Sequence, residues 1–264
     1  MCVICNNNSK ILRMGSYDKC KYCGTCIANI IPSQKKIQRV LEEHAGLYIL
    51  DTQKMFDLST YTTRLAALQK YAKSAKTVLD FGCGNGNFVK FLRSKKYKTF
   101  GYDKSVGITE HLFSEKLPFY KNENEIPNEY FDVITCFDVI EHATNPEKIM
   151  DVFRMKLKKG GILILSTPNA ESISSKVLGK NWWVFGPEAH FIIFSLFSLK
   201  LFLYNHNFNI LDSATDILTS WFVPSEKLLS RIGNKVVYLV LFPFKSFLFA
   251  SGYGDNIQIV AKVI

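Results

Sequence analysis

The residues best suited to chemistry lie in one segment, 78–86, which reads Val-Leu-Asp-Phe-Gly-Cys-Gly-Asn-Gly. Two apolar residues followed by Asp80 are typical of the end of a buried strand, and the three alternating glycines predict a tight turn into a helix at about 85–95. Glycine suits this turn because it adopts backbone angles closed to other residues and lets a ligand lie against bare backbone. The positive end of the helix would face that ligand. The segment therefore predicts a site for a nucleotide-type cofactor.

The spacing of the glycines and a second acidic residue narrow the kind of cofactor. The dinucleotide pattern G-x-G-x-x-G needs a glycine at the position of Asn87, so the match to that pattern fails. Residues 99–103 read as a second strand ending in Asp103, whose carboxylate could accept hydrogen bonds from both hydroxyls of a ribose. NAD would use the same geometry, so Asp103 alone does not identify the cofactor. Three glycines, together with Asp80 and Asp103, disfavour the interpretation as an ordinary strand–helix turn.

The D-x-G-x-G-x-G pattern resembles that of class I S-adenosylmethionine (SAM) methyltransferases, over about 70–190 and the last strand. Within them it is most similar to ubiquinone-biosynthesis O-methyltransferases and to bacterial methyltransferases with an N-terminal cysteine knuckle. The resemblance implies an α/β fold with a doubly wound, seven-stranded Rossmann-like sheet. It also implies SAM contacts from Asp80, Gly82, Cys83, Gly84, Gly86, Asp103, Asn122, Cys136 and Phe137.

The alternation of apolar and polar stretches from residue 76 onward supports such a sheet. Strands are expected near 77–81, 98–102, 117–120, 131–136, 161–166 and 256–263, the last of them antiparallel. We expect three parts: a cysteine-rich head (1–31), a helical linker that covers the cofactor (32–75), and the methyltransferase domain (76–264). Residues 214–253 match the family poorly and are interpreted as a hydrophobic insertion.

The head carries the spacing of a zinc knuckle pair. Five cysteines compete for four positions, and we predict that Cys26 is spare. A closed site of four thiolates stabilises a fold and leaves no position for a substrate, so this zinc would be structural. The alternative is a set of buried cysteines without a metal. The predicted ligands are Cys2, Cys5, Cys20 and Cys23.

A second group of polar residues follows the fourth expected strand. Asp138, Glu141 and His142 are spaced so that one helical turn would place them on one face. A similar E-x-x-E-H set binds a divalent ion in ubiquinone-type and small-RNA methyltransferases, with help from a later histidine, here His190. Three hypotheses stay open: His142 or His190 is a metal-free general base, the four residues hold Mg²⁺ or a similar ion, or they only stabilise a helix cap and a loop.

Two further segments bear on the acceptor. The adjacent Trp182 and Trp183 could stack on a sugar or ring, because two neighbouring tryptophans are seldom both fully buried, or they could plug the core. Glu188, on the same loop, is a weaker candidate base. The nearly apolar stretch 236–249 is too short to span a bilayer. It is expected to pack over the substrate pocket or, alternatively, to rest on an anionic membrane.

Composition sets the remaining expectations. The chain is 47% hydrophobic and 21% charged, which excludes general disorder. A net charge of +10 favours anionic partners such as nucleic acid, phosphorylated sugars or membrane. Seven cysteines and no recognisable signal peptide predict the cytoplasm. We expect O-methylation of a hydroxyl on a small-molecule or carbohydrate acceptor. One hypothesis for the acceptor is a lipid-linked polysaccharide precursor. The alternatives are an RNA methyltransferase that docks its substrate with the zinc head and a non-enzymatic scaffold.

Overall fold

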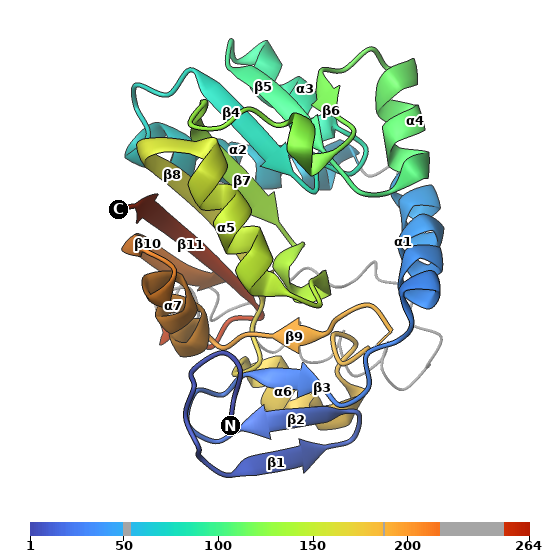
Figure 1. Cartoon of the computed structure of the whole chain (residues 1–264), viewed down its shortest axis with the longest axis vertical. Helices are drawn as coiled ribbons and strands as arrows, with labels where there is room; N and C mark the ends of the chain where they lie inside the picture. The colour runs from blue at the N-terminus through green and yellow to red at the C-terminus, as the bar shows by residue number, and fades with distance from the viewer. Residues whose placement is uncertain (50–53, 187, 217–250) are drawn as a thin grey trace.

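The computed structural model describes residues 1–49, 54–186, 188–216 and 251–264. Its centre is a seven-stranded sheet in the order β10-β11-β8-β7-β4-β5-β6 (Figure 1). The five strands β4 to β8 run parallel, whereas β10 and β11 are antiparallel to their neighbours. The expected sheet is confirmed. Its strands are β4 (Thr77–Phe81), β5 (Lys98–Tyr102), β6 (Phe119–Tyr120), β7 (Phe131–Phe137), β8 (Leu157–Pro168), β10 (Phe208–Asp216) and β11 (Asn256–Val263).

Helices cover both faces of this sheet, and alternate residues along each strand serve the two faces. Leu79, Ile134 and Leu163 pack in the larger core with α5 (Pro146–Lys156) and α7 (Leu196–Asn205). Val78 and Val133 pack in the second core with α2 (Lys54–Tyr71) and α3 (Asn87–Ser94). In Figure 1, α5 lies across the near face and α2 lies behind the sheet. The parallel strands are therefore buried on both sides, which is typical of a doubly wound fold.

The predicted linker contains α1 (Gln34–Ile49) and α2. Glu42 of α1 accepts hydrogen bonds from the Val106 and Gly107 amides, at 2.9 and 3.1 Å, and from the Ser105 hydroxyl at 2.7 Å. These groups begin α4 (Val106–Ser114). A carboxylate at a helix N-terminus is favourable, so Glu42 joins α1 to the edge of the sheet that carries Asp103.

Strand β10 includes the first residues of the segment 214–253, interpreted from the sequence as a hydrophobic insertion. The strand continues to Asp216, which pairs with Asn256 of β11. Its polar residues and irregular burial do not alternate as a half-buried strand should, because it is the edge strand of the sheet. Residues 217–250, which include the apolar 236–249 stretch, lie outside the described residues. Within the described ranges, every helix is too short or too polar to span a bilayer.

The cysteine-rich head forms a second, four-stranded sheet at the bottom of Figure 1. Its strands β1 (Ile11–Met14), β2 (Tyr17–Cys20) and β3 (Cys26–Ala28) form an antiparallel meander. The fourth strand, β9 (Ile192–Ile193), lies more than 160 residues further along the chain and pairs with β3. The sheet of the head therefore includes a strand from beyond the expected boundary at residue 31. The short elements η1 (Glu123–Glu125), η2 (Ile140–His142), α6 (Ile173–Leu178) and η3 (Gly179–Asn181) complete the fold.

Candidate functional site

The turn after β4 has the geometry that its glycines predict. Gly82, Gly84 and Gly86 have φ angles of 78°, 50° and 74°, in the left-handed region that glycine adopts most easily. A Cβ added at Gly82 would lie 2.3 Å from Val139 Cγ2, so this glycine is needed for packing. A Cβ added at Gly84 would meet nothing within 4 Å. Gly84 therefore presents bare backbone to open space, as a cofactor cradle requires.

Two carboxylates border this turn. Asp80 is buried and accepts a hydrogen bond from Thr135 Oγ1 at 2.7 Å, and burial raises its pKa to about 6. Asp103 accepts hydrogen bonds from the Gly84 amide at 3.1 Å and the Ser105 amide at 3.0 Å. Burial also raises the pKa of Asp103, although these amides oppose the shift. The second carboxylate is thus tied directly to the exposed backbone of the first turn.

Arg64, on α2, also belongs to this site, and sequence reasoning missed it. Its guanidinium carbon lies 3.8 Å from the centroid of the Phe137 ring, and one nitrogen lies 3.6 Å from Asp138 Oδ2. Its positive charge lowers the pKa of Asp80, against the larger effect of burial. The helical pattern at 61–71 predicts that Arg64 lies on a helix before the first strand, but it carries no signal that this helix reaches the end of β7.

The other predicted cofactor residues differ in what they offer. Cys83 is buried against Gly101, where an added Cβ would lie 2.7 Å from its sulfur. Cys136 is completely buried in the larger core, so its side chain is not exposed to a ligand. Phe137 lies half-buried beneath Arg64. Asn122 is exposed and donates to Glu125 Oε1 at 2.9 Å.

Glu141, His142 and His190 come together at the end of β7. One ligand atom from each lies within 4.8 Å of the others, and the two imidazole centroids are 4.8 Å apart. His142 Nδ1 lies 2.8 Å from the Ala189 carbonyl oxygen, and His190 Nδ1 lies 2.7 Å from that of Val184. Because a carbonyl oxygen can only accept, Nδ1 must carry the proton in both rings, and Nε2 carries the lone pair of the neutral form.

Asp138 does not join this group, which corrects the expectation of one helical turn with three ligands on one face. The turn η2 begins only at Ile140, and Asp138 precedes it with a φ of 57°. Its carboxylate instead accepts from Ser166 Oγ at 3.1 Å and pairs with Arg64. Glu141 is buried and accepts from Thr167 Oγ1 at 3.0 Å. Burial, and then the charge of Asp138, raises the pKa of Glu141 well above its usual range.

The two adjacent tryptophans of the loop that carries His190 have different surroundings. Trp182 is buried in a core cluster that joins this loop to the head. Trp183 is half-buried, and its ring centroid lies 6.1 Å from that of His190. Of the pair, Trp183 is therefore the one placed beside the histidines. Glu188 is exposed, and its carboxylate forms an ion pair with Lys36 at 2.7 Å on the surface of the protein.

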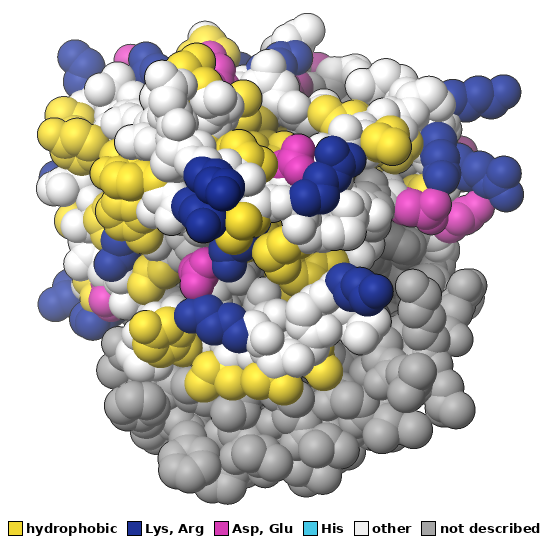
Figure 2. All heavy atoms as spheres, turned by 90° about the horizontal axis from the view of Figure 1, so that it is seen from below, with side chains coloured by type: hydrophobic (Ala, Val, Ile, Leu, Met, Phe, Trp, Pro, Cys, Tyr) yellow, Lys and Arg dark blue, Asp and Glu magenta, His cyan; other side chains and the backbone are white. Residues whose placement is uncertain are grey.

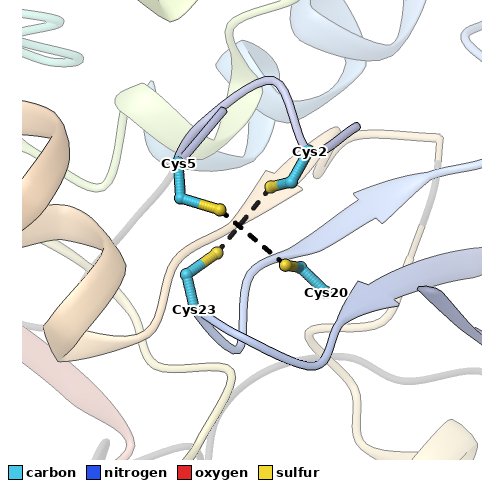
Figure 3. Close-up of side chains that lie close together, drawn as sticks. All are labelled: Cys2, Cys5, Cys20 and Cys23. Carbon is cyan, nitrogen blue, oxygen red and sulfur yellow. Dashed lines mark hydrogen bonds between the residues drawn. The ribbon is translucent and has the colours of Figure 1, made fainter. Parts of the chain in front are cut away.

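The structure brings together the four cysteines predicted to bind zinc, and their sulfurs point toward one another (Figure 3). Cys2 and Cys23 sulfurs are 3.7 Å apart, and Cys5 and Cys20 sulfurs are 3.8 Å apart. A disulfide would require about 2.05 Å. Four sulfurs at about 2.3 Å from one tetrahedral zinc are separated by about 3.8 Å, so the observed spacing fits a closed site.

The pKa values of these thiols also reflect their crowding. The hydrogen bond with Cys23 lowers the pKa of Cys2, and the same contact raises the pKa of Cys23. Cys26 lies outside the group. It is completely buried in the cluster that contains Tyr17 and Trp182. The fifth cysteine thus belongs to the packing between head and loop.

Comparisons with known proteins agree with this geometry. Residues 53–213 match the family model of a methyltransferase domain. The ubiquinone biosynthesis O-methyltransferase of Candida albicans, a mitochondrial protein, is 34% identical over 118 residues, or 38% of this chain and 35% of the relative. The ubiquinone biosynthesis O-methyltransferase of Histophilus somni is 32% identical over 123 residues, or 40% of this chain and 52% of the relative. The chain thus spans about half or less of the length of these curated relatives.

Solved structures share the fold. A SAM-dependent methyltransferase from Archaeoglobus fulgidus superimposes with a TM-score of 0.53 at 20% identity, covering 80% of this chain and all of the other. The 1,6-didemethyltoxoflavin-N1-methyltransferase of Burkholderia thailandensis gives 0.57 at 13% identity, covering 90% and 95% of the two chains. At these identities the likeness concerns the fold alone. Together with the family model, it confirms the expected resemblance: this chain belongs to the methyltransferase domain family of class I SAM-dependent enzymes.

Proposed function

We propose that this protein transfers a methyl group from SAM to a hydroxyl of a small-molecule or carbohydrate acceptor. The observation that carries the proposal is one arrangement at the carboxyl edge of the sheet. The open backbone of Gly84 follows β4, the carboxylate of Asp103 follows β5, and His142 follows the neighbouring β7. His190, from the loop before β9, lies beside His142. Doubly wound enzymes bind their ligands at this edge.

Asp103 would hold the ribose of the cofactor, since a carboxylate that accepts two amide hydrogen bonds keeps lone pairs for the ribose hydroxyls. Asp80 would bind the amino group of the methionine half. Arg64, whose charge already acts on Asp80, would pair with the carboxylate of that half. When bound, SAM supplies an electrophilic methyl group on a good leaving group, so the protein mainly has to align a nucleophile and remove its proton.

His142 or His190 would remove that proton as a metal-free general base. In both rings the backbone carbonyl at Nδ1 fixes the tautomer and leaves the basic lone pair on Nε2. Burial raises the pKa of Glu141 beside them, which favours it as a support for the histidines over a role as a second base.

A divalent ion on Glu141, His142 and His190 is the competing account of the same group. The three ligand atoms are close enough for one ion. Two imidazoles and one carboxylate suit transition metals better than Mg²⁺, which prefers oxygen ligands, and Asp138 does not add a fourth donor. Binding would also require Glu141 to ionise against a raised pKa. These costs lead us to favour the metal-free base.

We further propose that Cys2, Cys5, Cys20 and Cys23 hold a structural zinc ion. The donor set, the sulfur spacing and the burial of three of the four residues support this assignment. Such a site would hold the two knuckle turns of the head together, and its four thiolates would leave no position for a substrate.

The distribution of basic side chains on the surface bears on the class of acceptor. On the face shown in Figure 2, Lys and Arg side chains are scattered among hydrophobic and acidic ones and form no continuous stripe. This pattern gives no support to the RNA alternative on that face, since phosphate backbones are bound by clustered basic residues. Contact of 236–249 with a membrane and a cytoplasmic location stay predictions of the sequence.

Two measurements test the proposal. Calorimetry with S-adenosylhomocysteine should show binding of one molecule per chain. A host lysate incubated with tritiated SAM should gain label in the small-molecule or lipid-sugar pool only when the protein is added. If the protein does not bind S-adenosylhomocysteine, the non-enzymatic scaffold is favoured instead. Label confined to RNA would refute the proposed class of acceptor.

A further inference from the structure

The head and the loop that carries His190 are built as one unit. Strand β9 begins two residues after His190 and pairs with β3, Ile192 with Ile27 and Ile193 with Cys26. The Ala28 amide donates to the Phe191 carbonyl at 2.8 Å, which extends the pairing toward the histidine. The backbone on the C-terminal side of His190 therefore belongs to the sheet of the head.

Tyr17 contacts His190 itself. Its hydroxyl donates a 2.7 Å hydrogen bond to the His190 carbonyl oxygen, across 173 positions of the sequence. The ring is 1% exposed and packs against Phe185 with centroids 5.1 Å apart. Burial raises the pKa of Tyr17, so the hydroxyl keeps the proton that it donates. This bond holds the carbonyl end of the peptide group that follows His190.

The proposed metal ligands lie in the same frame. Tyr17 and Cys20 belong to β2, and the Cys23 carbonyl accepts a 2.5 Å hydrogen bond from Ser195 Oγ. Ser195 lies two residues after the end of β9 and caps α7. The segment 190–195 is thus held by Tyr17 at one end and by the Cys23 turn at the other.

The far side of the loop is bound to His142. The Phe191 amide donates to the Glu141 carbonyl at 2.8 Å, and the Ala189 carbonyl accepts from His142 Nδ1 at 2.8 Å. The residues on both sides of His190 therefore contact the turn η2, while its own carbonyl contacts the head. A small rotation of the loop would change the distance between the two imidazoles.

We infer that the cysteine-rich head sets the position of His190 in the active site, with Tyr17 as the positioning residue and the metal at the four cysteines as the group that keeps β2 and the Cys23 turn in place. The inference rests on the proposed function for its catalytic meaning. In this arrangement, loss of the metal would displace His190 while the SAM cradle after β4 stays intact. Asp80, Gly84 and Asp103 are hydrogen-bonded to Thr135, to Ser105 and to one another, all within the large sheet and its turns.

The test compares two matched variants of the full-length protein. Tyr17→Phe removes only the buried hydroxyl and keeps the packed ring. Tyr22→Phe makes the same change on the outside of the head, where Tyr22 is 53% exposed and contacts Phe197. Histidine-labelled protein is followed by NMR, with the His190 ring signal assigned from its absence in His190→Gln. His111, on α4, is the internal reference, and the chain has five histidines in all.

We expect Tyr17→Phe to shift the His190 ring signal and to leave His111 unmoved, with zinc content and S-adenosylhomocysteine affinity unchanged. Tyr22→Phe should move neither signal. Chelation of the metal from the unaltered protein should shift His190 in the same direction or broaden it. In the labelled acceptor pool, the transfer rate of Tyr17→Phe should fall roughly tenfold to hundredfold, as expected for a misplaced catalytic group.

An unmoved His190 signal in Tyr17→Phe, or equal shifts in the two tyrosine variants, would overturn the inference. That result is separate from failure of the proposed function, which would appear as no binding of S-adenosylhomocysteine by the unaltered protein. A protein that binds the product but shows no coupling between Tyr17 and His190 retains the function and loses only the positioning role.

Discussion

Replacing Asp80 by asparagine should weaken cofactor binding and stabilise the free protein at the same time. Asp80 is 4% exposed, and burial raises its pKa from the ordinary 3.8 to about 6. Because the folded-state pKa lies above that of the unfolded chain, folding favours the protonated form. The contribution of Asp80 to the stability of the ligand-free protein is therefore most favourable below about pH 4, falls as pH rises toward 6, and stays at its lower value at neutral pH.

The size of this effect follows from the shift. About two pKa units correspond to at most about 3 kcal/mol at pH 7. Asparagine removes the charge and can still accept the hydrogen bond from Thr135. We expect Asp80→Asn to gain roughly 1–3 kcal/mol, which raises the melting temperature by about 2–4 °C per kcal/mol in a chain of this size.

Cofactor binding should respond in the opposite direction. If the ionised carboxylate binds the methionine amino group, only about a tenth of the protein is competent at pH 5, so affinity should be about tenfold lower there than at pH 8. Asp80→Asn should bind weakly at every pH and lose this dependence. Calorimetry with S-adenosylhomocysteine between pH 5 and 8, together with thermal melts, measures both effects.

Asp132 on β7 provides a matched control. Although burial acts to raise its pKa, hydrogen bonds from Lys158 and from the Lys76 and Thr77 amides hold that pKa well below the ordinary value. Asp132→Asn should therefore destabilise the protein and leave product affinity unchanged. The reasoning is refuted if Asp80→Asn lowers the melting temperature, keeps its affinity, or behaves like the control.

Three shorter predictions concern the other groups. Gly84→Ala should lower the free energy of unfolding by about 1 kcal/mol, because residue 84 has a left-handed backbone. It should also reduce the affinity for S-adenosylhomocysteine at least tenfold in calorimetry, because the new methyl group enters the open space of the cradle. Unchanged affinity would mean that the cofactor binds elsewhere. His142→Ala should lower the transfer rate roughly a hundredfold or more with product affinity kept, and an equal loss of affinity would contradict a catalytic role. Metal analysis should find about one zinc per chain, retained in Cys26→Ser and lost in Cys23→Ser; a metal-free preparation with native stability would exclude the knuckle.

The parts of the fold that the sequence predicts well are those governed by local rules. The strand, glycine turn and helix at 77–94 follow one another directly, so their residues carry the whole signal. For four of the five parallel strands, the predicted ends lie within two residues of the observed ends. The edge strand β10 was missed because only part of its surface is covered, and its pattern is correspondingly mixed.

Where polar side chains meet, the sequence alone was insufficient. The spacing of Asp138, Glu141 and His142 was compatible with one helical face, but the left-handed backbone at Asp138 and its bond to Ser166 separate it from the others. Arg64 reaches the site from a helix before the first strand, and no local pattern encodes that approach.

By itself, then, the sequence determined the glycine turn after β4, the family and the two Cys-x-x-Cys pairs of the head, because each depends on residues a few positions apart. Only the tertiary structure decided that β9 completes the sheet of the head and that Tyr17 reaches His190 across 173 positions. It also decided which tryptophan lies beside the histidines. Contacts at such separations depend on how layers pack, and packing is a property of the whole chain that no short run of residues contains.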